Sequence, residues 1–441
     1  SRLDIVVLGA TGFTGSYIVR AIASSPLFQE KSIAVAGRNE AKLRDTLTEI
    51  EKDTGVLGVS FFPVIVADTS DDDSLTSMAR QARVIINAVG PFRLHGEQIV
   101  KAAVENGASY VDVAGEPAFL EKVEMKFAKL ARENGVYVVG ACGFDSIPSD
   151  LGTDFLKRNF DGTLGYVEAF LSNSFGPSGY SFSTTSYDTL MLGLSSTDED
   201  KLGEMRRTIM PERLPSAKHK VPKRSTIWKV DEEEMKGWVL PFPGADKSVV
   251  KRSQYYDFHV NGMKPVQMEP YLLLGSLSNA LLLTGWITFF EGLSSFEWTR
   301  KWLKAYPEQF SFNMFKNSGP TKQQMEESHF DYFLFGRGWA PGEQVDEQNP
   351  SQRVSSTKTI TKICQFVLAL AVCHGPDLGY IGTSGCVASA ALALLYDIDR
   401  LPKEGGVYTT ASAFRDTRIF DYLKSFGVTF EMVPLKENSK L

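Results

Sequence analysis

The stretch Gly9-Ala10-Thr11-Gly12-Phe13-Thr14-Gly15 decides how the first third of the chain folds. It follows the branched apolar run Ile5-Val6-Val7-Leu8 and precedes an apolar helical pattern at residues 17–22. A β-branched run, a glycine-rich turn and an apolar helical pattern are typical of a first strand, a phosphate-binding loop and a first helix. In such loops one glycine permits the tight turn, the next admits a pyrophosphate, and the third lets the helix pack on the strand. We therefore predict a dinucleotide-binding loop whose contacts are Gly9, Thr11, Gly12, Phe13, Thr14 and Gly15.

Strand and helix patterns alternate through the first 140 residues. Six short apolar runs are typical of strands, at residues 5–8, 32–36, 61–67, 84–89, 110–113 and 136–139. Helical patterns lie between them, at residues 40–52, 74–81, 97–105 and 116–133. Apolar strands joined by helices form a parallel sheet that is buried on both faces. The sequence thus predicts an α/β fold, with a Rossmann-type doubly wound parallel sheet in residues 1–148.

The pattern changes after residue 148, and we predict a second, mixed α/β domain at 149–403. A final segment, 404–441, is expected to pack back near the first domain. Within the second domain, residues 206–247 are polar and contain five prolines, which favours an excursion or lid. Its part 206–224 carries seven Lys or Arg against one Glu. That charge fits a solvated loop, with docking on an anionic membrane surface as the alternative.

An apolar segment, 270–290, lies between Glu269 and Glu291 and contains no formal charge. Its 21 residues are long enough to span a bilayer. Several hydroxyl and amide side chains and two glycines interrupt it, however, and acids flank it. We therefore predict a buried helix at a subunit interface or the wall of an apolar substrate cavity, with membrane insertion as the alternative.

Composition excludes several classes of protein. The net charge of −6 argues against nucleic acid as a partner, because phosphate binding needs a basic surface. Four scattered cysteines, Cys142, Cys364, Cys373 and Cys386, show no C-x-x-C spacing and are expected to be reduced thiols. No metal-site or hydrolase motif occurs, so we predict no metal. The first strand begins at the start of the sequence, so we expect no targeting peptide within it and a cytoplasmic protein.

The end of the second expected strand predicts which dinucleotide binds. Folds that prefer NAD place an acid there to bond the ribose 2′-hydroxyl, whereas this strand ends in Ala36-Gly37-Arg38-Asn39. An arginine in that place suits a 2′-phosphate, and Lys42 adds a second positive charge one turn later. We therefore predict NADP, held by Arg38, Asn39 and Lys42; the alternative is that Arg38 is a solvated residue at a helix start.

The third and fourth strands predict the remaining contacts. Asp68 follows the third strand, where it would meet the adenine amine or else cap the next helix. The fourth strand ends in Ala88-Val89-Gly90-Pro91-Phe92, at the sheet edge where ligands lie in these folds. We predict that these five residues lie near the nicotinamide ribose; a purely structural turn is the alternative.

Several motifs together resemble the saccharopine dehydrogenase-like oxidoreductases, a group that includes trans-acting enoyl reductase-like members. The motifs are Gly9–Gly15, Ala36-Gly37-Arg38, Gly90-Pro91-Phe92 with Gly96-Glu97, Tyr110–Glu116, Ala141–Asp150 and, more loosely, Tyr380–Ser384 and Glu404–Thr409. The resemblance implies a Rossmann domain, a mixed-sheet domain that covers the cofactor and pairs subunits as a homodimer, and nicotinamide-dependent chemistry. The arginines that hold an amino-dicarboxylate in the lysine-pathway enzymes are not found here, so the resemblance implies a fold and not that substrate.

The proton source for hydride transfer is expected at the carboxyl edge of the fifth and sixth strands. Candidates from the matched motifs are Asp145, Ser146 and Cys142, with Glu116 beside them. Asp145 and Ser146 have the alternative of capping the next helix, and Cys142 that of a small buried residue. His95 is the histidine best placed for the cleft, although a surface position is the simpler interpretation.

Three functions fit these observations. The first is an NADP-dependent reductase of an activated C=C, C=N or C=O bond in a small or medium apolar metabolite. The second is a protein associated with membranes or lipid droplets through segments 206–224 and 270–290. The third is a cofactor-binding scaffold without chemistry, since no acid and base pair stands out.

Overall fold

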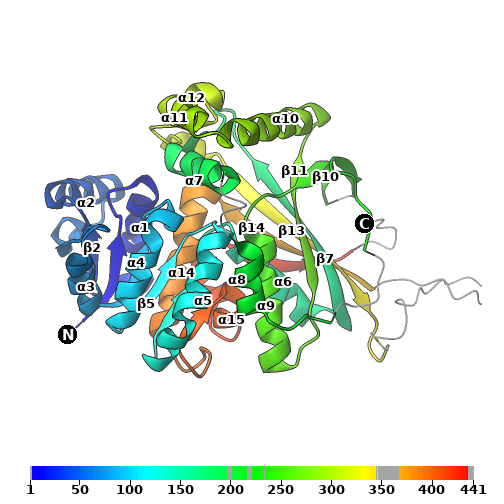
Figure 1. Ribbon diagram of the computed structural model, residues 1–441, viewed down its shortest axis with the longest axis horizontal. Helices are drawn as coiled ribbons and strands as arrows, with labels where there is room; N and C mark the ends of the chain where they lie inside the picture. Colours follow the sequence, from blue (N-terminus) through cyan, green and yellow to red (C-terminus); the bar gives the residue numbers. More distant parts are fainter. Residues whose placement is uncertain are drawn as a thin grey trace, which may run out of the picture.

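Two seven-stranded sheets stand side by side with helices between and around them (Figure 1). The computed structural model describes residues 2–195, 201–215, 221–232, 234–343, 345 and 367–435. A continuous apolar core extends from the first sheet through two helices, α14 (Thr383–Tyr396) and α6 (Ile147–Asn159), to the second sheet.

The first sheet is parallel throughout and has the order β15-β6-β5-β4-β1-β2-β3. Its strands are β1 (Leu3–Leu8), β2 (Ile33–Gly37), β3 (Val64–Val66), β4 (Ala82–Asn87), β5 (Ser109–Asp112), β6 (Tyr137–Val139) and β15 (Gly406–Tyr408). All six strands expected in residues 1–148 are present, which confirms the Rossmann-type sheet. The seventh, β15, comes from the C-terminal segment and pairs with β6.

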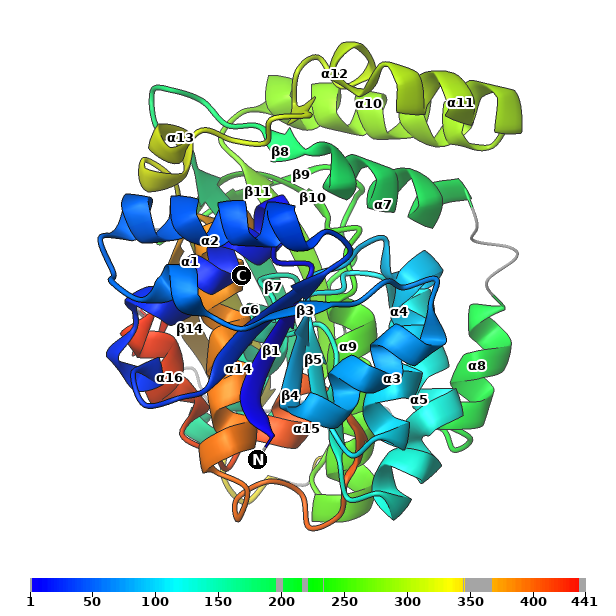
Figure 2. The ribbon, with the colours of Figure 1, turned by 90° about the vertical axis from the view of Figure 1, so that its left-hand side faces the viewer.

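Helices cover both faces of the first sheet, as expected from its apolar strands. They are α1 (Phe13–Ser24), α2 (Glu40–Thr54), α3 (Asp72–Gln81), α4 (Phe92–Glu105) and α5 (Pro117–Glu133), with short turns η1 (Pro26–Phe28) and η2 (Val59–Phe61). The view in Figure 2 places α3, α4 and α5 on one side of β1, and α1 and α14 on the other. Each helix buries one apolar stripe against a strand that is itself fully buried.

The second sheet is mixed, with the order β16-β14-β13-β7-β11-β10-β9. Its strands are β7 (Thr163–Ser174), β9 (Trp228–Asp231), β10 (Lys236–Pro241), β11 (Gln267–Leu274), β13 (His329–Trp339), β14 (Val367–Pro376) and β16 (Thr429–Val433). Only β7 and β11 pair in parallel; the other neighbours are antiparallel. Helix α9 (Asp246–Asn261) packs on β11, and α6 on β13 and β14. The mixed second sheet predicted from the sequence is therefore present.

The proline-rich stretch 206–247 differs from the expected loop, because it contains β9 and β10 and follows α8 (Leu202–Ile209). Pro241 is the last residue of β10, opposite Tyr271, and the other four prolines lie outside the strands. In its part 206–224, two of the seven cations form ion pairs with buried acids: Arg206 pairs with Glu121 at 3.0 Å, and Arg224 with Glu168 at 2.7 Å. Residues 216–220 lie outside the described part.

The apolar segment 270–290 is not one helix. Its first residues belong to β11, and α10 (Leu277–Ser294) begins after the break at Gly275 and Ser276. Helix α10 belongs to an outlying layer above the two sheets (Figures 1 and 2). That layer also contains α7 (Thr184–Ser195), α11 (Glu297–Ala305), α12 (Pro307–Phe310), α13 (Lys322–Glu326) and a two-stranded sheet of β8 (Phe182–Ser183) and β12 (Phe315–Lys316). It has its own apolar cluster, which includes Tyr187, Trp286 and Phe290.

The C-terminal segment divides between the two sheets. After β15, the helices α15 (Thr410–Phe414) and α16 (Ile419–Ser425) lead to β16 at the edge of the second sheet. In the described residues one helical run, 378–396, is long and apolar enough to cross a membrane. It comprises η3 (Leu378–Gly382) and α14, and 83% of it is buried, which is typical of a core helix. Cys142, Cys373 and Cys386 are free and buried, while Cys364 lies outside the described residues.

Candidate functional site

A cleft of about 260 Å³ opens at the carboxyl edge of the first sheet, above the glycine loop. The ends of β1, β2 and β4 and the start of α1 form its floor, and residues at the start of α7 form its roof. Ligands of doubly wound sheets lie at this edge. Its lining consists of Leu8, Gly9, Thr11, Gly12, Phe13, Thr14, Gly37, Arg38, Ala67, Thr69, Ala88, Val89, Gly90, His95, Ser183 and Thr185.

The glycine loop is shaped by close backbone contacts. Gly9 has a φ of 86°, and a Cβ added to it would stand 2.8 Å from Val89 Cγ2. A Cβ on Gly15 would stand 2.1 Å from the carbonyl oxygen of Gly9, because α1 starts directly against the end of β1. Any larger residue at position 9 or 15 would therefore push the helix away from the strand. These contacts match the turn and packing roles predicted for the first and third glycines.

The N-terminus of α1 faces the cleft without a side chain to cap it. Gly12 occupies the cap position with extended backbone and makes no side-chain hydrogen bond. The first N–H groups of a helix have no partner within the helix and carry its positive dipole end. Since Phe13 and Thr14 line the cleft at this point, the arrangement suits a bound pyrophosphate.

Arg38 lies on the rim of the cleft and is available to bind an anion. Its exposed guanidinium makes no hydrogen bond or ion pair within the described residues. Asn39 is used locally, because its Oδ1 accepts the Lys42 N–H at 3.0 Å and caps α2. Lys42 is exposed on the first turn of α2 and is not part of the lining. Among the described residues that line the cleft, Arg38 is therefore the cation that a 2′-phosphate would meet.

Gly15 lies outside the lining, and so do three other predicted cofactor residues, Asp68, Pro91 and Phe92. Asp68 Oδ1 accepts from the N–H and hydroxyl of Ser70, at 2.9 and 2.7 Å, and these bonds lower its pKa. The helix cap at α3 is Asp71 and not Asp68. Pro91 precedes α4, and Phe92 packs its ring on Phe119 with centroids 5.7 Å apart. The contacts of these three residues with cofactor stay predictions.

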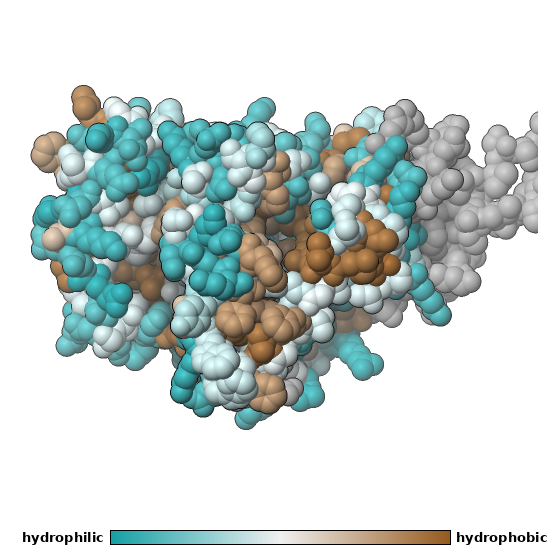
Figure 3. Space-filling model, turned by 90° about the horizontal axis from the view of Figure 1, so that it is seen from above, coloured by the Kyte–Doolittle hydropathy of each residue, from teal (hydrophilic) through white to brown (hydrophobic). Residues whose placement is uncertain are grey.

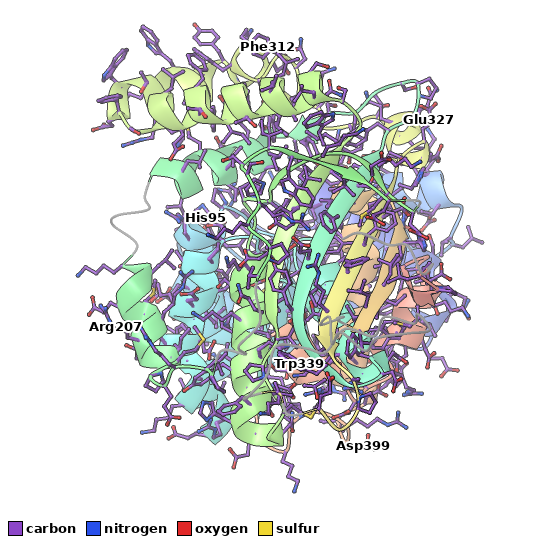
Figure 4. All side chains as sticks on the ribbon, turned by 90° about the vertical axis from the view of Figure 1, so that its right-hand side faces the viewer. His95, Arg207, Phe312, Glu327, Trp339 and Asp399 are labelled. Atoms are coloured by element: carbon purple, nitrogen blue, oxygen red, sulfur yellow. The ribbon has the colours of Figure 1, made fainter. Side chains whose placement is uncertain are left out.

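The roof of the cleft comes from the second domain, and sequence patterns missed it. Ser183 at the end of β8 and Thr185 at the start of α7 line the cleft, and the Ser183 N–H donates to the hydroxyl of Tyr380 at 2.8 Å. The Tyr380 ring meets Phe13 of the glycine loop edge to face at 4.5 Å. Ser183 and Thr185 belong to no recognisable motif, whereas Tyr380 stands in one of the motifs that carried the resemblance. His95 also reaches the lining, below α7 (Figure 4), with Nδ1 3.4 Å from Thr69 Oγ1.

A buried polar network supports the floor from below. Asn87 donates to the hydroxyl of Tyr110 at 2.9 Å, and that hydroxyl donates to Asp112 at 2.9 Å. Asp112 also accepts the N–H groups of Ala114 and Ala141, which fixes the loops after β5 and β6. Burial raises the pKa of Asp112 to about 6 despite these bonds.

None of the three predicted proton donors lines the cleft itself. Cys142 lies fully in the core, its thiol donates to the Val139 carbonyl at 3.3 Å, and burial holds its pKa well above the usual value. Ser146 occupies the cap position of α6, yet its buried hydroxyl has no hydrogen-bond partner. Asp145 retains partial exposure and lies against Gly115, where an added Cβ would be 2.3 Å from its Oδ2. It has no hydrogen-bond partner in the described residues, and burial raises its pKa to about 6. Of the three, Asp145 is the one whose side chain is partly exposed and makes no hydrogen bond within the described residues.

Glu116 has a structural role at the start of α4. Its two carboxylate oxygens accept the N–H groups of Phe92 and Arg93, at 2.8 and 3.0 Å, and so hold the start of α4. Sequence patterns also missed Asp246, at the start of α9. Burial raises the pKa of Asp246 well above its usual value, and the charge of Asp145 raises it further. Its Oδ2 accepts from the Tyr332 hydroxyl at 2.7 Å. Asp145 and Asp246 are near enough to interact electrostatically because the second domain folds over the first.

A dinucleotide cleft at the edge of a doubly wound sheet, closed by a second domain, defines a nicotinamide-dependent oxidoreductase. The family model described as the saccharopine dehydrogenase NADP binding domain matches residues 5–139. The chain is 52% identical to a "Lipid droplet localized protein" of Caenorhabditis elegans over 432 residues, with 98% of both chains covered. It is 35% identical to the human "Saccharopine dehydrogenase-like oxidoreductase" over 439 residues, again with 98% of both covered. The chain belongs to the saccharopine dehydrogenase-like oxidoreductase family, and its first domain binds NADP.

The fold has a counterpart among solved structures. Saccharopine dehydrogenase (L-Glu forming) from Saccharomyces cerevisiae superposes with a TM-score of 0.51 at 13% identity, with 98% of this chain and 99% of that one covered. At that identity the likeness concerns the fold alone. The individual cofactor contacts and the proton donor stay predictions.

Proposed function

We propose that the protein is an NADPH-dependent reductase that transfers hydride to an activated C=C, C=N or C=O bond of a small or medium apolar metabolite. The observation that carries this proposal is the exposed guanidinium of Arg38 on the rim of the cleft, which makes no hydrogen bond or ion pair within the described residues, although its charge acts on the nearby carboxylate of Asp68. A free arginine there favours the 2′-phosphate of NADP over the 2′-hydroxyl of NAD.

In this mechanism the chain mainly binds and positions. Bound NADPH supplies the hydride. The loop at Gly9–Gly15 and the N-terminus of α1 would hold the pyrophosphate, and Val89, Gly90 and Thr185 would line the site of the nicotinamide. Asp145, with a pKa of about 6 and no hydrogen-bond partner, is the carboxyl we assign to give a proton to the substrate. Holding the reacting atoms together supplies much of the acceleration in such a site.

The test is oxidation of NADPH and of NADH in the presence of a panel of apolar enals, imines and ketones. For Arg38→Gln we expect kcat/KM with NADPH to fall about tenfold to a hundredfold, because a charge-assisted pair contributes about 1.5–3 kcal/mol. The value with NADH should stay within about twofold. The control is Lys52→Gln, which removes a charge from the last turn of α2, the helix that follows Arg38. It should change neither value. Equal losses with both cofactors would contradict the role of Arg38, and no turnover of any substrate would contradict the reductase.

A second candidate function is a lipid-associated nucleotide-binding protein with a scaffold role. It is supported by the name of the Caenorhabditis elegans relative and by the apolar side chains that α10 exposes. NADPH binding without turnover across the whole panel would favour it. Localisation in the cytoplasm and assembly as a homodimer stay predictions of the sequence.

A further inference from the structure

The outlying layer exposes an unusual number of large apolar side chains. Nine of the twenty exposed large apolar residues in the described chain lie within residues 277–312. We call them the α10–α12 surface: Leu277, Leu281, Leu282, Phe289, Phe296, Trp298, Trp302, Tyr306 and Phe312. Figure 3, which looks down on this layer, shows brown and tan side chains gathered on this face. Scattered apolar residues are normal on a protein surface, whereas a contiguous group indicates an interaction site.

Helix α10 is divided between a packed face and a free one. Trp286 and Phe290 are buried against Tyr187 of α7. On the other side Leu281, Leu282 and Phe289 are exposed, and Leu282 has 72% of its surface in solvent. The helix is about 27 Å long, so its free face forms an extended apolar ridge.

Helix α11 adds aromatic residues in a regular row. Trp298 and Trp302 stand four residues apart, which places them on one face of α11, and Tyr306 follows as the residue that ends the helix. The two tryptophan rings touch edge to face at 5.4 Å. Rings that carry one polar N–H or O–H concentrate where hydrocarbon meets water.

Phe312 extends the surface beyond α12. Its ring is 80% exposed, and its backbone has a φ of 52°, which is uncommon for a bulky residue. Figure 4 shows it at the outer edge of the layer. The backbone therefore holds an apolar side chain outward at an energetic cost, which favours a partner for that ring.

Charge identifies the chemistry of that partner. Residues 277–312 carry three cations, Arg300, Lys301 and Lys304, and three anions, Glu291, Glu297 and Glu308. The surface is electrically neutral, so an anionic lipid or a charged protein gains nothing from it. Helix α8, which carries Arg206 and Arg207 of the basic stretch, lies on a separate part of the molecule (Figures 2 and 4).

We propose that the α10–α12 surface docks on a zwitterionic phospholipid layer, with α10 lying in the plane of the layer and the aromatic row of α11 at headgroup level. The proposal deepens the lipid association proposed above and does not depend on hydride transfer. Neutral charge, aromatic residues with polar tips and an extended ridge fit a lipid surface, where an apolar face is buried without a shape-complementary partner. Helix α7 packs beneath α10 and lines the NADP cleft with Thr185, so docking places the roof of the cleft next to the lipid.

The test is flotation of the full chain with triolein droplets coated with phosphatidylcholine. We expect the wild type to float, and the double variants Leu281→Ser/Leu282→Ser and Trp298→Ser/Trp302→Ser each to lose about tenfold or more in partition. The matched control is Leu57→Ser/Phe61→Ser, because these residues are 89% and 84% exposed on the first domain. This control should float like the wild type.

Two further measurements distinguish the alternatives. Flotation should change little between about 0.05 and 0.5 M salt, because no net charge is involved, and brominated phosphatidylcholine should quench the fluorescence of Trp298 and Trp302. NADPH binding, measured in all variants, should not change, so failure of the reductase proposal stays separate. The proposal is overturned if the wild type does not float, if it floats only with anionic lipid at low salt, or if the control loses as much as the variants. Light scattering measures the oligomeric state. If the wild type is a dimer that does not float and the α10 and α11 variants are monomers, the surface binds a second copy of the chain, and the lipid proposal is overturned.

Discussion

Helices α10 and α14 have equally apolar compositions, yet they occupy opposite surroundings. In α14, twelve of fourteen residues are buried, between the two sheets. In α10, only four of eighteen are buried, namely Ala280, Trp286, Phe290 and Ser294. Average hydrophobicity therefore does not decide which apolar helix enters the core.

The size of the side chains explains the difference. α14 is built largely from Gly, Ala, Ser and Cys, so neighbouring elements approach it closely; a Cβ added to Gly385 would stand 2.6 Å from the Cβ of Phe426. α10 carries Leu, Phe and Trp on every side, which no closely packed site between two sheets would admit. Small residues therefore fit the crowded interior between the sheets, and large apolar residues fit a surface that binds a partner.

The largest test of this comparison introduces a charge into each helix. Ala391→Asp in α14 places a carboxylate where no partner and no water are near, and we expect a loss of about 3–5 kcal/mol in the free energy of unfolding. Leu282→Asp in α10 should change it by less than about 0.5 kcal/mol, since the side chain is already in solvent. Urea denaturation followed by circular dichroism measures both. Equal losses would show that α10 is packed as tightly as α14.

The first domain could be predicted almost completely, and the reason is local. Each strand there is a short branched apolar run, and each helix lies between two such runs, so periodicity alone marks them. In the second domain β7 is twelve residues long and β13 eleven, their partners are distant in sequence, and β9 and β10 lie within a proline-rich stretch. Apolar segment 270–290 was misjudged for a related reason, because composition does not show that two residues, Gly275 and Ser276, divide a strand from a helix.

The candidate site also has a part that could be predicted from local sequence and a part that could not. The loop at Gly9–Gly15 and Arg38 could be recognised because consecutive residues carry the signal. Ser183 and Thr185 could not, because they reach the cleft from β8 and the start of α7, far along the chain from the strands that form its floor. The isolation of the Asp145 carboxyl was equally invisible, since it depends on which donors the fold leaves out of reach.

A smaller test removes one buried hydrogen bond beside each helix. Tyr380→Phe, just before α14, leaves the Ser183 N–H without its acceptor, and we expect a loss of about 2 kcal/mol in stability. Trp286→Phe in α10 removes the bond from Nε1 to the Phe310 carbonyl, 2.8 Å long, and should cost a similar amount. Only the first bond borders the cleft, so only Tyr380→Phe should weaken NADPH binding in a fluorescence titration. A weaker NADPH complex in Trp286→Phe would show that the outlying layer is coupled to the cleft.

The smallest expected effect concerns pH and Asp145, near the N-terminal end of α14. Burial raises the pKa of this carboxyl from 3.8 to about 6 in the folded protein. The folded state therefore holds the proton more tightly than the unfolded state. The resulting stabilisation is complete below about pH 4 and is lost as pH rises through about 6.

Partial exposure of Asp145 reduces the size of this effect. We expect the free energy of unfolding of Asp145→Asn, relative to the wild type, to rise by about 1 kcal/mol between pH 4 and pH 7, because the amide has no proton to lose. Comparing the two proteins cancels the contributions of buried acids that do not interact with Asp145, Asp112 among them. Leu281→Ser/Leu282→Ser in α10 alters no titratable group, so its stability should run parallel to the wild type at every pH. Urea denaturation at several pH values measures all three, and a parallel curve for Asp145→Asn would mean that Asp145 is solvated, with an ordinary affinity for its proton.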